Sequence, residues 1–86
     1  MAHDEKSIHD GVKEFILREF LPGEDPGALL DDTQLMTTGI LDSLATLKLI
    51  TFLEERFGIR VEAHEADSEN LNTLGDITRF VSSKLG

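Results

Sequence analysis

Residues 39–58 constrain the fold more than any other part of this chain, because they predict one strongly amphipathic helix with both ends marked. Asp42 and Ser43 favour a helix N-terminus, since their side-chain oxygens accept hydrogen bonds from free backbone N–H groups. Gly58 stands where a left-handed C-cap is expected. We therefore expect a helix over residues 43–57. Its apolar face recurs at three- and four-residue intervals and comprises Thr46, Leu49, Ile50, Leu53 and Phe57.

An earlier helix is predicted over residues 7–21. Ser7 followed by Asp10 resembles a capping box, and an acid in the first turn is also favoured by the helix dipole. Pro22 and Gly23 end this helix, because neither residue type continues a helix readily. One apolar stripe runs along it, formed by Ile8, Val12, Phe15, Ile16 and Phe20.

The C-terminal part predicts a last helix and a short one before it. Thr73 and Asp76 form another pair of the capping-box kind, so the last helix should start at Thr73. A helix of one or two turns is expected at residues 67–71, after an extended link at residues 59–61. The apolar residues of the last helix are Leu74, Ile77, Phe80, Val81 and Leu85. Three substantial helices and a minor one predict an all-α fold, a small four-helix bundle.

The long connection over residues 22–41 needs structure of its own, because loops longer than about 12–15 residues without any are uncommon in compact domains. We expect a helical turn within residues 25–30. We also expect a sharp bend at Gly39, since glycine adopts conformations that other residues avoid. Four side chains should anchor the connection to the core: Leu29, Leu30, Leu35 and Met36.

Size and composition restrict the function. A chain of 86 residues suffices for one domain, residues 1–86, with a modest core and no deep enclosed pocket, which disfavours a self-sufficient enzyme. A hydrophobic content of 40% indicates a folded domain. Because there is no cysteine, disulfides, thiolate metal sites and cysteine nucleophiles are excluded.

The charge of the chain restricts its partners and location. There are 17 acidic and 8 basic residues, a formal net charge of −9, so we expect no nucleic-acid binding and a preference for basic partners. Solubility alone is the alternative explanation for this acidity. The N-terminus lacks the apolar run of a signal peptide, and no apolar stretch is long enough to span a membrane. We expect a soluble, cytoplasmic protein that is not membrane-embedded.

The three histidines do not predict a metal site. His3 and His9 are spaced so that their imidazoles do not share a helix face, and His64 stands alone. Nothing around Ser43 resembles the strained turn of a nucleophile elbow. A hydrolase that uses Ser43 with His9 or His64 is therefore the weakest alternative.

Ser43 itself has two interpretations. It is most simply part of a helix cap. A serine that carries a phosphate-linked group would also be well placed here, near free N–H groups and the positive end of the helix dipole. The residues beside it are either ordinary exposed side chains or a partner-docking patch. This candidate patch comprises Leu44, Ala45, Leu47, Lys48 and Phe52.

The triplet Asp42-Ser43-Leu44 resembles the Asp-Ser-Leu signature that acyl carrier proteins, a family of four-helix bundles, carry at the start of the second helix. Gly39 before the triplet and the amphipathic helix after it match the same pattern. The length and acidity of the chain are similar as well. The resemblance covers nearly the whole chain, from the first helix to the last.

The resemblance implies that Ser43 is esterified by a 4′-phosphopantetheine arm, transferred from coenzyme A by a separate phosphopantetheinyl transferase with magnesium. Asp42 would assist this modification, and Leu44 would contact the transferase. The thiol of the arm would hold an acyl or aminoacyl thioester, so the protein is implied to be a monomeric carrier and not an enzyme. Its other implied partners are an adenylating acyl or aminoacyl ligase and a downstream acyl or aminoacyl transferase or synthase.

The kind of carrier is suggested by finer features. Fatty-acid carriers usually display a run of acids on the second helix, whereas here no acid appears on that helix before Glu54. Residues 38–44 and 67–73 are more similar to stand-alone aminoacyl carriers, including D-alanyl carrier proteins. We therefore expect an aminoacyl or specialised-pathway carrier more than a fatty-acid synthase carrier. The alternative from another class is an unmodified helical interaction module in which Ser43 is only a cap.

Overall fold

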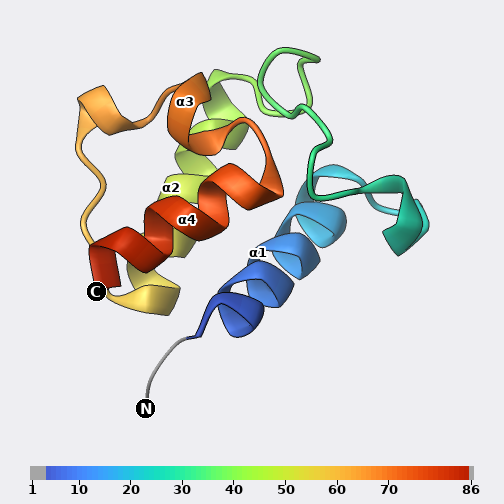
Figure 1. Ribbon diagram of the computed structural model, residues 1–86. Coiled ribbons are helices and arrows are strands. Elements are labelled where there is room, and N and C mark those ends of the chain that lie inside the picture. Colours follow the sequence, from blue (N-terminus) through green and yellow to red (C-terminus); the bar gives the residue numbers. More distant parts are fainter. Residues whose placement is uncertain (1–3, 86) are drawn as a thin grey trace.

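A computed structural model describes residues 4–85, which are helical apart from their connections and contain no strand (Figure 1). In chain order the elements are α1 (Glu5–Phe20), a 3₁₀ turn (Pro26–Ala28), α2 (Ser43–Phe57), a second 3₁₀ turn (Ala63–Glu65), α3 (Ser68–Leu71) and α4 (Leu74–Leu85). The structure confirms the predicted all-α bundle of three long helices and a short one. None of the helices in this part of the chain is long and apolar enough to cross a membrane.

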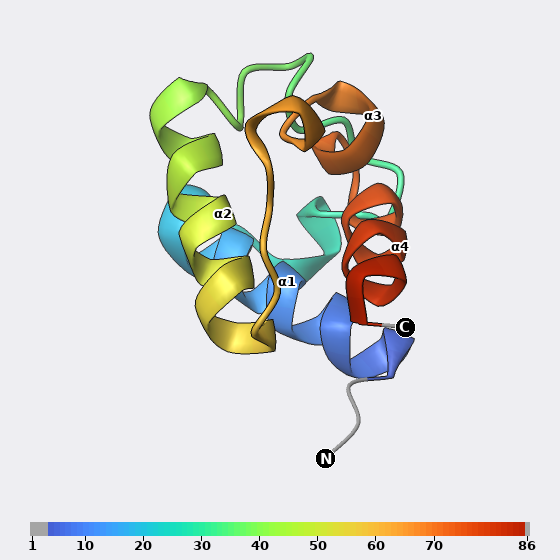
Figure 2. The same ribbon diagram turned by 90° about the vertical axis from the view of Figure 1, so that its left-hand side faces the viewer.

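The three long helices surround one centre. α1 and α4 run side by side and make the most extensive contact between helices (Figure 1). The perpendicular view shows α2 and α4 on opposite sides of the core, with α1 passing beneath them (Figure 2). The short helix α3 packs against α4. Because each long helix has a single apolar stripe, this arrangement turns all three stripes inward.

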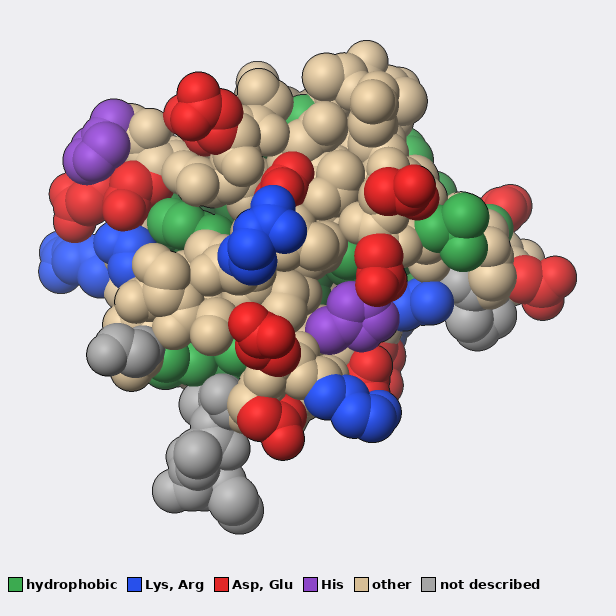
Figure 3. All heavy atoms as spheres, viewed as in Figure 1, with side chains coloured by type: hydrophobic (Ala, Val, Ile, Leu, Met, Phe, Trp, Pro, Cys, Tyr) green, Lys and Arg blue, Asp and Glu red, His purple; other side chains and the backbone are tan. Residues whose placement is uncertain are grey.

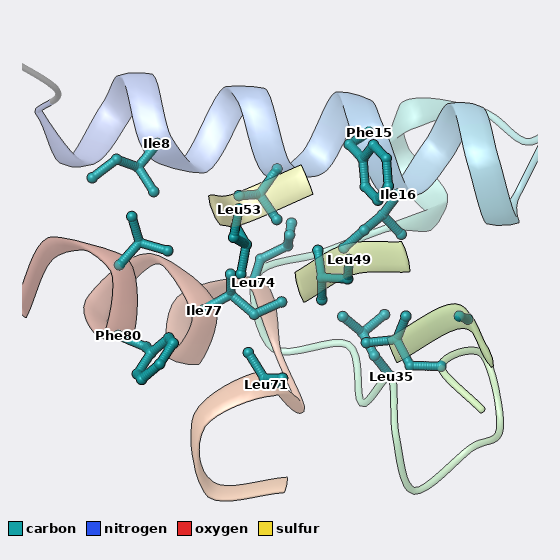
Figure 4. Close-up of a cluster of buried hydrophobic side chains, with 14 of the residues drawn as sticks. Ile8, Phe15, Ile16, Leu35, Leu49, Leu53, Leu71, Leu74, Ile77 and Phe80 are labelled. Carbon is teal, nitrogen blue, oxygen red and sulfur yellow. The ribbon is translucent and has the colours of Figure 1, made fainter. Parts of the chain in front are cut away.

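The core is one cluster to which every long helix contributes (Figure 4). Ile8 lies on the side of α1 that faces α4, whereas Ile16 lies beside Leu49 of α2, and Leu35 enters from the connection between α1 and α2. The C-terminal part adds Leu71, Leu74, Ile77, Phe80 and Val81. Full burial of one such side chain contributes roughly 1.5–3 kcal/mol, so this cluster holds the bundle together.

The start of α1 differs from the prediction. The helix begins at Glu5, before the predicted start at Ser7, because Asp4 supplies the cap and its Oδ1 accepts the N–H of Ser7 at 2.8 Å. The predicted Ser7–Asp10 capping box is wrong, and the exposed Asp10 bonds other side chains instead. Two suitable cap residues lie within one turn, and the sequence pattern does not rank them. The predicted apolar stripe is buried except for Phe20, which is half-buried.

The connection between α1 and α2 has the predicted helical turn, at Pro26–Ala28. Leu29 and Leu35 are fully buried and Met36 packs against the core, as predicted. Leu30 was expected in the core but is 56% exposed, so that prediction is wrong. Since Leu29 takes the inward position after the turn, its neighbour Leu30 points outward, and the N–H of Leu30 bonds within the next turn.

The ends of α2 follow their predicted signals. Gly58 has φ 67° and its N–H donates to the carbonyl oxygen of Glu54 at 2.9 Å, which forms the left-handed C-cap. Gly39 has φ 85°, so the bend before the helix uses a conformation that favours glycine. The predicted apolar face is buried except for Ile50, which is half-buried.

α4 begins at Leu74, next to the predicted start at Thr73. The Oγ1 of Thr73 accepts the N–H of Asp76 at 3.0 Å, which confirms that this pair marks the helix start. α3 and the irregular link before it also fall where the sequence predicts them.

Candidate functional site

Asp42 caps α2 through both its side chain and its backbone. Its Oδ1 accepts the N–H of Ala45 at 2.8 Å, and its carbonyl oxygen accepts the N–H of Thr46 at 2.8 Å. The backbone of Asp42 is extended, with φ −83° and ψ −172°, as is usual for an N-cap residue. The cap predicted from the Asp42-Ser43 pair therefore belongs to Asp42, and Ser43 is the first helical residue.

Ser43 is exposed at the start of α2, and its hydroxyl makes no hydrogen bond within residues 4–85. The backbone N–H groups of Ser43 and Leu44 likewise bond no other described residue, which is normal at a helix N-terminus. The first turn of α2 contains no acidic side chain. A negatively charged group on Ser43 would meet N–H donors and the positive end of the helix dipole, with the Asp42 carboxylate already engaged in capping.

A second Asp-Ser pair at a helix start, Asp67-Ser68 of α3, shows what sets Ser43 apart. Asp67 Oδ1 accepts the N–H of Glu69 at 3.1 Å, so Asp67 caps its helix as Asp42 does. Glu69, however, places a carboxylate in the first turn of α3, whereas the first turn of α2 has none. An Asp-Ser pair alone is therefore a cap signal, and only the pair at α2 also presents an N-terminus suited to an anion.

A hollow of about 410 Å³ lies beside Ser43, between the start of α2 and the turn before α3. It is lined by Met36, Leu41, Asp42, Ser43, Thr46 and Ala66. Apolar and polar side chains therefore meet next to the Ser43 hydroxyl. The sequence did not indicate this hollow, because its lining comes from three separate segments.

Three of the predicted docking residues lie together on the outside of α2. Leu44 and Leu47 are 65% and 61% exposed, and Lys48 is exposed beside them. They line one side of a shallow groove of about 400 Å³, and Phe15 and Glu19 of α1 line the other side. Exposed leucines beside a groove are typical of a surface that docks a partner.

The other two predicted docking residues are placed differently. Ala45 is only 8% exposed, so its assignment to the exposed patch is wrong. A rotation of about 100° per residue carries the chain from the outward direction of Leu44 to the inward direction of Ala45, one turn before Leu49. Phe52 is half-buried, and its ring stacks on that of Phe15 with centroids 4.2 Å apart and planes 12° apart. Phe52 therefore joins α2 to α1 at the edge of the groove.

The loop that leads into Asp42 is held by Asn72, a residue that the sequence analysis did not single out. The carbonyl oxygen of Asn72 accepts the N–H of Leu35 at 2.6 Å. Its Oδ1 accepts the N–H groups of Met36 at 2.9 Å and Thr37 at 3.3 Å. An isolated asparagine before a helix resembles an ordinary turn residue, and these side-chain partners lie 36 and 35 positions away in the sequence.

His9 lies between two carboxylates. Its Nδ1 is 3.0 Å from Asp10 Oδ1, and its Nε2 is 2.5 Å from Asp31 Oδ1. Hydrogen bonds to Asp10 and then to Asp31 raise the pKa of His9 above its ordinary value. The carbonyl oxygen of Asp31 also accepts the N–H of Gly75 at 3.1 Å, so this contact ties the connection to both α1 and α4.

The histidines are not assembled with Ser43 into a hydrolase site. Neither His9 nor His64 lines the hollow beside Ser43, and His3 lies outside the described residues. Figure 3 shows the two described histidines well apart on one face, each next to acidic side chains. Across residues 4–85, no group of three His, Asp or Glu side chains is placed to hold a metal ion.

The sequence matches the family described as "Phosphopantetheine attachment site" over residues 16–81, a segment that contains the whole of α2. The chain belongs to this family. An acyl carrier protein of Thermotoga maritima is 31% identical over 81 residues, which cover 94% of this chain and 95% of the relative. An acyl carrier protein of Chlamydia caviae is 30% identical over 80 residues, 93% of this chain and 99% of the relative. A D-alanyl carrier protein of Streptococcus suis is 43% identical over 68 residues, 77% of this chain and 85% of the relative.

Family membership confirms the predicted resemblance and the cofactor that it implied. Proteins of this family bear a 4′-phosphopantetheine group and act as carriers, not as catalysts. They work with transferases that attach the group and with synthetic enzymes that use the cargo. The start of α2 fits such a group, because it combines an exposed hydroxyl with backbone N–H donors for a phosphate.

Proposed function

We propose that this chain is a carrier whose Ser43 is esterified with 4′-phosphopantetheine and whose cargo is an acyl or aminoacyl group. One observation carries the proposal: the Ser43 hydroxyl is exposed at the start of α2, inside the matched segment, and has no hydrogen bond within residues 4–85. Because Asp42 does the capping, modification of Ser43 leaves the helix cap intact. When bound, the arm supplies a thiol that holds the cargo as a thioester, and the chain itself has no cysteine.

The modification joins Ser43 Oγ to the β-phosphorus of coenzyme A. Oγ forms the new ester bond, adenosine 3′,5′-bisphosphate leaves as the anhydride bond breaks, and the hydroxyl proton passes to a base of the transferase. The proposed assisting role of Asp42 is supported by its free carboxylate oxygen, since Oδ1 accepts the N–H of Ala45 while Oδ2 bonds none of the described residues. A carboxylate oxygen is a suitable ligand for a magnesium ion that the transferase and coenzyme A bring to this site.

The docking surface of the proposed carrier is formed by Leu44, Leu47 and Lys48. These side chains are exposed on α2 directly after Ser43, so a partner that reaches Ser43 covers them. Burying two exposed leucines favours association with an apolar patch on the partner. Its partners are a phosphopantetheinyl transferase, an adenylating acyl or aminoacyl ligase, and a downstream transferase or synthase.

An aminoacyl or specialised-pathway cargo is favoured over the cargo of a fatty-acid synthase. α2 carries no acid before Glu54, so its exposed face is apolar and weakly basic where it adjoins Ser43. The D-alanyl carrier protein of Streptococcus suis, at 43% identity, supports the same choice. The helices of residues 4–85 share one core, which supports a single carrier domain. A cytoplasmic location is part of the proposal, because the proposed modification and loading need coenzyme A and an adenylating ligase.

The intact mass of the protein tests the attachment. The purified chain is incubated with coenzyme A, magnesium and a broad-specificity phosphopantetheinyl transferase, and we expect a gain of one phosphopantetheine. Ser43→Ala should abolish the gain. Ser68→Ala is the matched control, because Ser68 also follows an aspartate cap at a helix start, and it should leave the gain unchanged. No gain by a folded wild-type chain would indicate an unmodified interaction module.

The kind of cargo is tested on the modified protein. Adenylating ligases are supplied with amino acids or with fatty acids, and the mass of the carrier is measured after each incubation. Loading with amino acids, and not with long-chain fatty acids, supports an aminoacyl carrier. Loading by fatty-acid ligases alone would contradict that choice while leaving the attachment at Ser43 established.

A further inference from the structure

We propose that Asn72 is a positioning residue for the modification of Ser43, because it fastens the loop that presents the Asp42-Ser43 pair. The inference rests on the proposed function of Ser43 and adds a residue outside the signature triplet. Asn72 is the residue that ends α3, and its side chain bonds the loop that leads into α2.

Asn72 holds three consecutive backbone N–H groups of the loop. Its carbonyl oxygen accepts from Leu35 at 2.6 Å, and its Oδ1 accepts from Met36 at 2.9 Å and from Thr37 at 3.3 Å. Buried and half-buried N–H groups of a loop need such partners, because no regular ladder of hydrogen bonds supplies them. The Asn72 side chain thus accepts hydrogen bonds from two backbone N–H groups, those of Met36 and Thr37, that would otherwise have to bond water.

The fastening extends from the loop base to the helix start. The N–H of Leu41 donates to the carbonyl oxygen of Leu35 at 2.8 Å, so residues 35–41 form a closed loop whose base is held by Asn72. Leu41 is 3% exposed and directly precedes Asp42. A displacement of Leu35 is therefore transmitted to Leu41 through their hydrogen bond, and from Leu41 along the chain to the adjacent Asp42 and Ser43.

Among residues 4–85, the hydrogen bonds that reach this loop from another element all come from Asn72. The hydroxyl groups of Thr37 and Thr38 bond Gln34, immediately before the loop, and add no external attachment. The buried side chains of Leu35 and Leu41 remain as apolar anchors. Removal of the Asn72 amide should therefore loosen the loop without unfolding the bundle.

A looser loop lowers the fraction of the chain that presents Ser43 in the form that the transferase binds. The apparent affinity of the transferase for the carrier falls in proportion to that fraction, while the rate of transfer within the bound complex is unchanged. Loss of two ordinary hydrogen bonds predicts a rise in the KM for the carrier of about 5-fold or more, with kcat nearly constant.

Three variants test this role. Asn72→Ala removes the Oδ1 acceptor, and Asn72→Asp restores an oxygen in its place. Asn70→Ala is the matched control, because Asn70 lies in α3, two residues before Asn72, and its Nδ2 bonds the Glu65 carbonyl oxygen at 2.9 Å and not the loop. For each variant, kcat and KM for phosphopantetheinyl transfer are measured, together with hydrogen exchange of the Met36 and Thr37 amides.

We expect Asn72→Ala to raise KM and to speed exchange at both amides, while Asn72→Asp and Asn70→Ala stay close to the wild type. An unchanged KM in Asn72→Ala overturns the proposal. A lower kcat with a lower melting temperature and an unchanged KM also overturns it, since that result indicates only a structural role. A folded wild-type chain that is never modified instead refutes the proposed function of Ser43, and this inference with it.

Discussion

The imidazole Nε2 of His9 in α1 lies 2.5 Å from Oδ1 of Asp31, a residue 22 positions further along the chain. The other ring nitrogen, Nδ1, faces Asp10 Oδ1 at 3.0 Å. Only the doubly protonated ring can donate to both carboxylates, because a neutral imidazole has one N–H and one lone pair. The geometry therefore favours the charged form of His9 in the folded state.

This contact predicts a stability that depends on pH. The folded-state pKa of His9 is raised above the unfolded value of about 6.5, chiefly by the hydrogen bond to Asp10 and then by that to Asp31. The stabilisation is therefore complete below about pH 6.5 and is lost as the pH rises through the folded-state pKa. We expect the free energy of unfolding, measured in urea between about pH 6 and pH 9, to fall with pH.

His9→Gln provides the comparison for that prediction. Glutamine cannot become charged, so the fall in stability over this range should be smaller in the variant. The other charged side chains around His9, which include Glu5, Lys6 and Arg79, are present in both proteins, and their effects cancel in the difference. The same pH dependence in both proteins would show that the charge of His9 does not contribute.

The division of roles between Asp42 and Ser43 predicts different stabilities for two adjacent variants. Asp42→Ala removes the acceptor of the Ala45 N–H and should cost about 0.5–2 kcal/mol, as is typical of a lost N-cap. Ser43→Ala removes an exposed hydroxyl without a partner in residues 4–85 and should stay within about 0.5 kcal/mol of the wild type. Urea unfolding measures both values. The reverse order would assign the cap to Ser43.

The exposed position of Leu44 predicts that charge at this residue impairs modification more than folding. Leu44→Glu places a carboxylate on a 65%-exposed side chain, so the stability should change by no more than about 0.5 kcal/mol. The KM of the transferase should rise, because the partner would have to desolvate that charge. Leu30→Glu is the matched control, since Leu30 is also exposed, at 56%, but lines neither the groove nor the hollow at Ser43. Equal effects of the two variants would argue against a specific contact at Leu44.

The helices could be predicted from the sequence because their apolar residues follow a strict period and their ends carry Gly58 or Thr73. The predicted burial was wrong where the spacing of apolar residues does not show which side chains face the core. Ala45 is small, so hydropathy did not show that it continues the buried row to Leu49. Leu30 is apolar, yet the irregular chain after the 3₁₀ turn decides which of two neighbouring leucines faces the core.

The candidate site was predictable only in part, for a related reason. The Asp42-Ser43 pair is a local signal, since a cap and its helix are neighbours in sequence. The contacts of Asn72 with Met36, and of His9 with Asp31, join residues 36 and 22 positions apart. Such contacts depend on how the helices pack, and a single sequence does not show that.

The left-handed conformation of Gly58 predicts a backbone cost for any side chain at this position. Gly58→Ala places a Cβ at φ 67°, which costs roughly 1–2 kcal/mol by intramolecular crowding. Apart from the two adjacent residues of the chain, no described residue has an atom within 4 Å of that Cβ, so packing against other parts of the fold adds nothing. Gly27→Ala is the matched control, because its site is equally open and its φ is not in the left-handed range, and it should be neutral or slightly stabilising. Thermal and urea unfolding compare the two, and an equal loss in both variants would contradict the assignment of the cost to the C-cap of α2.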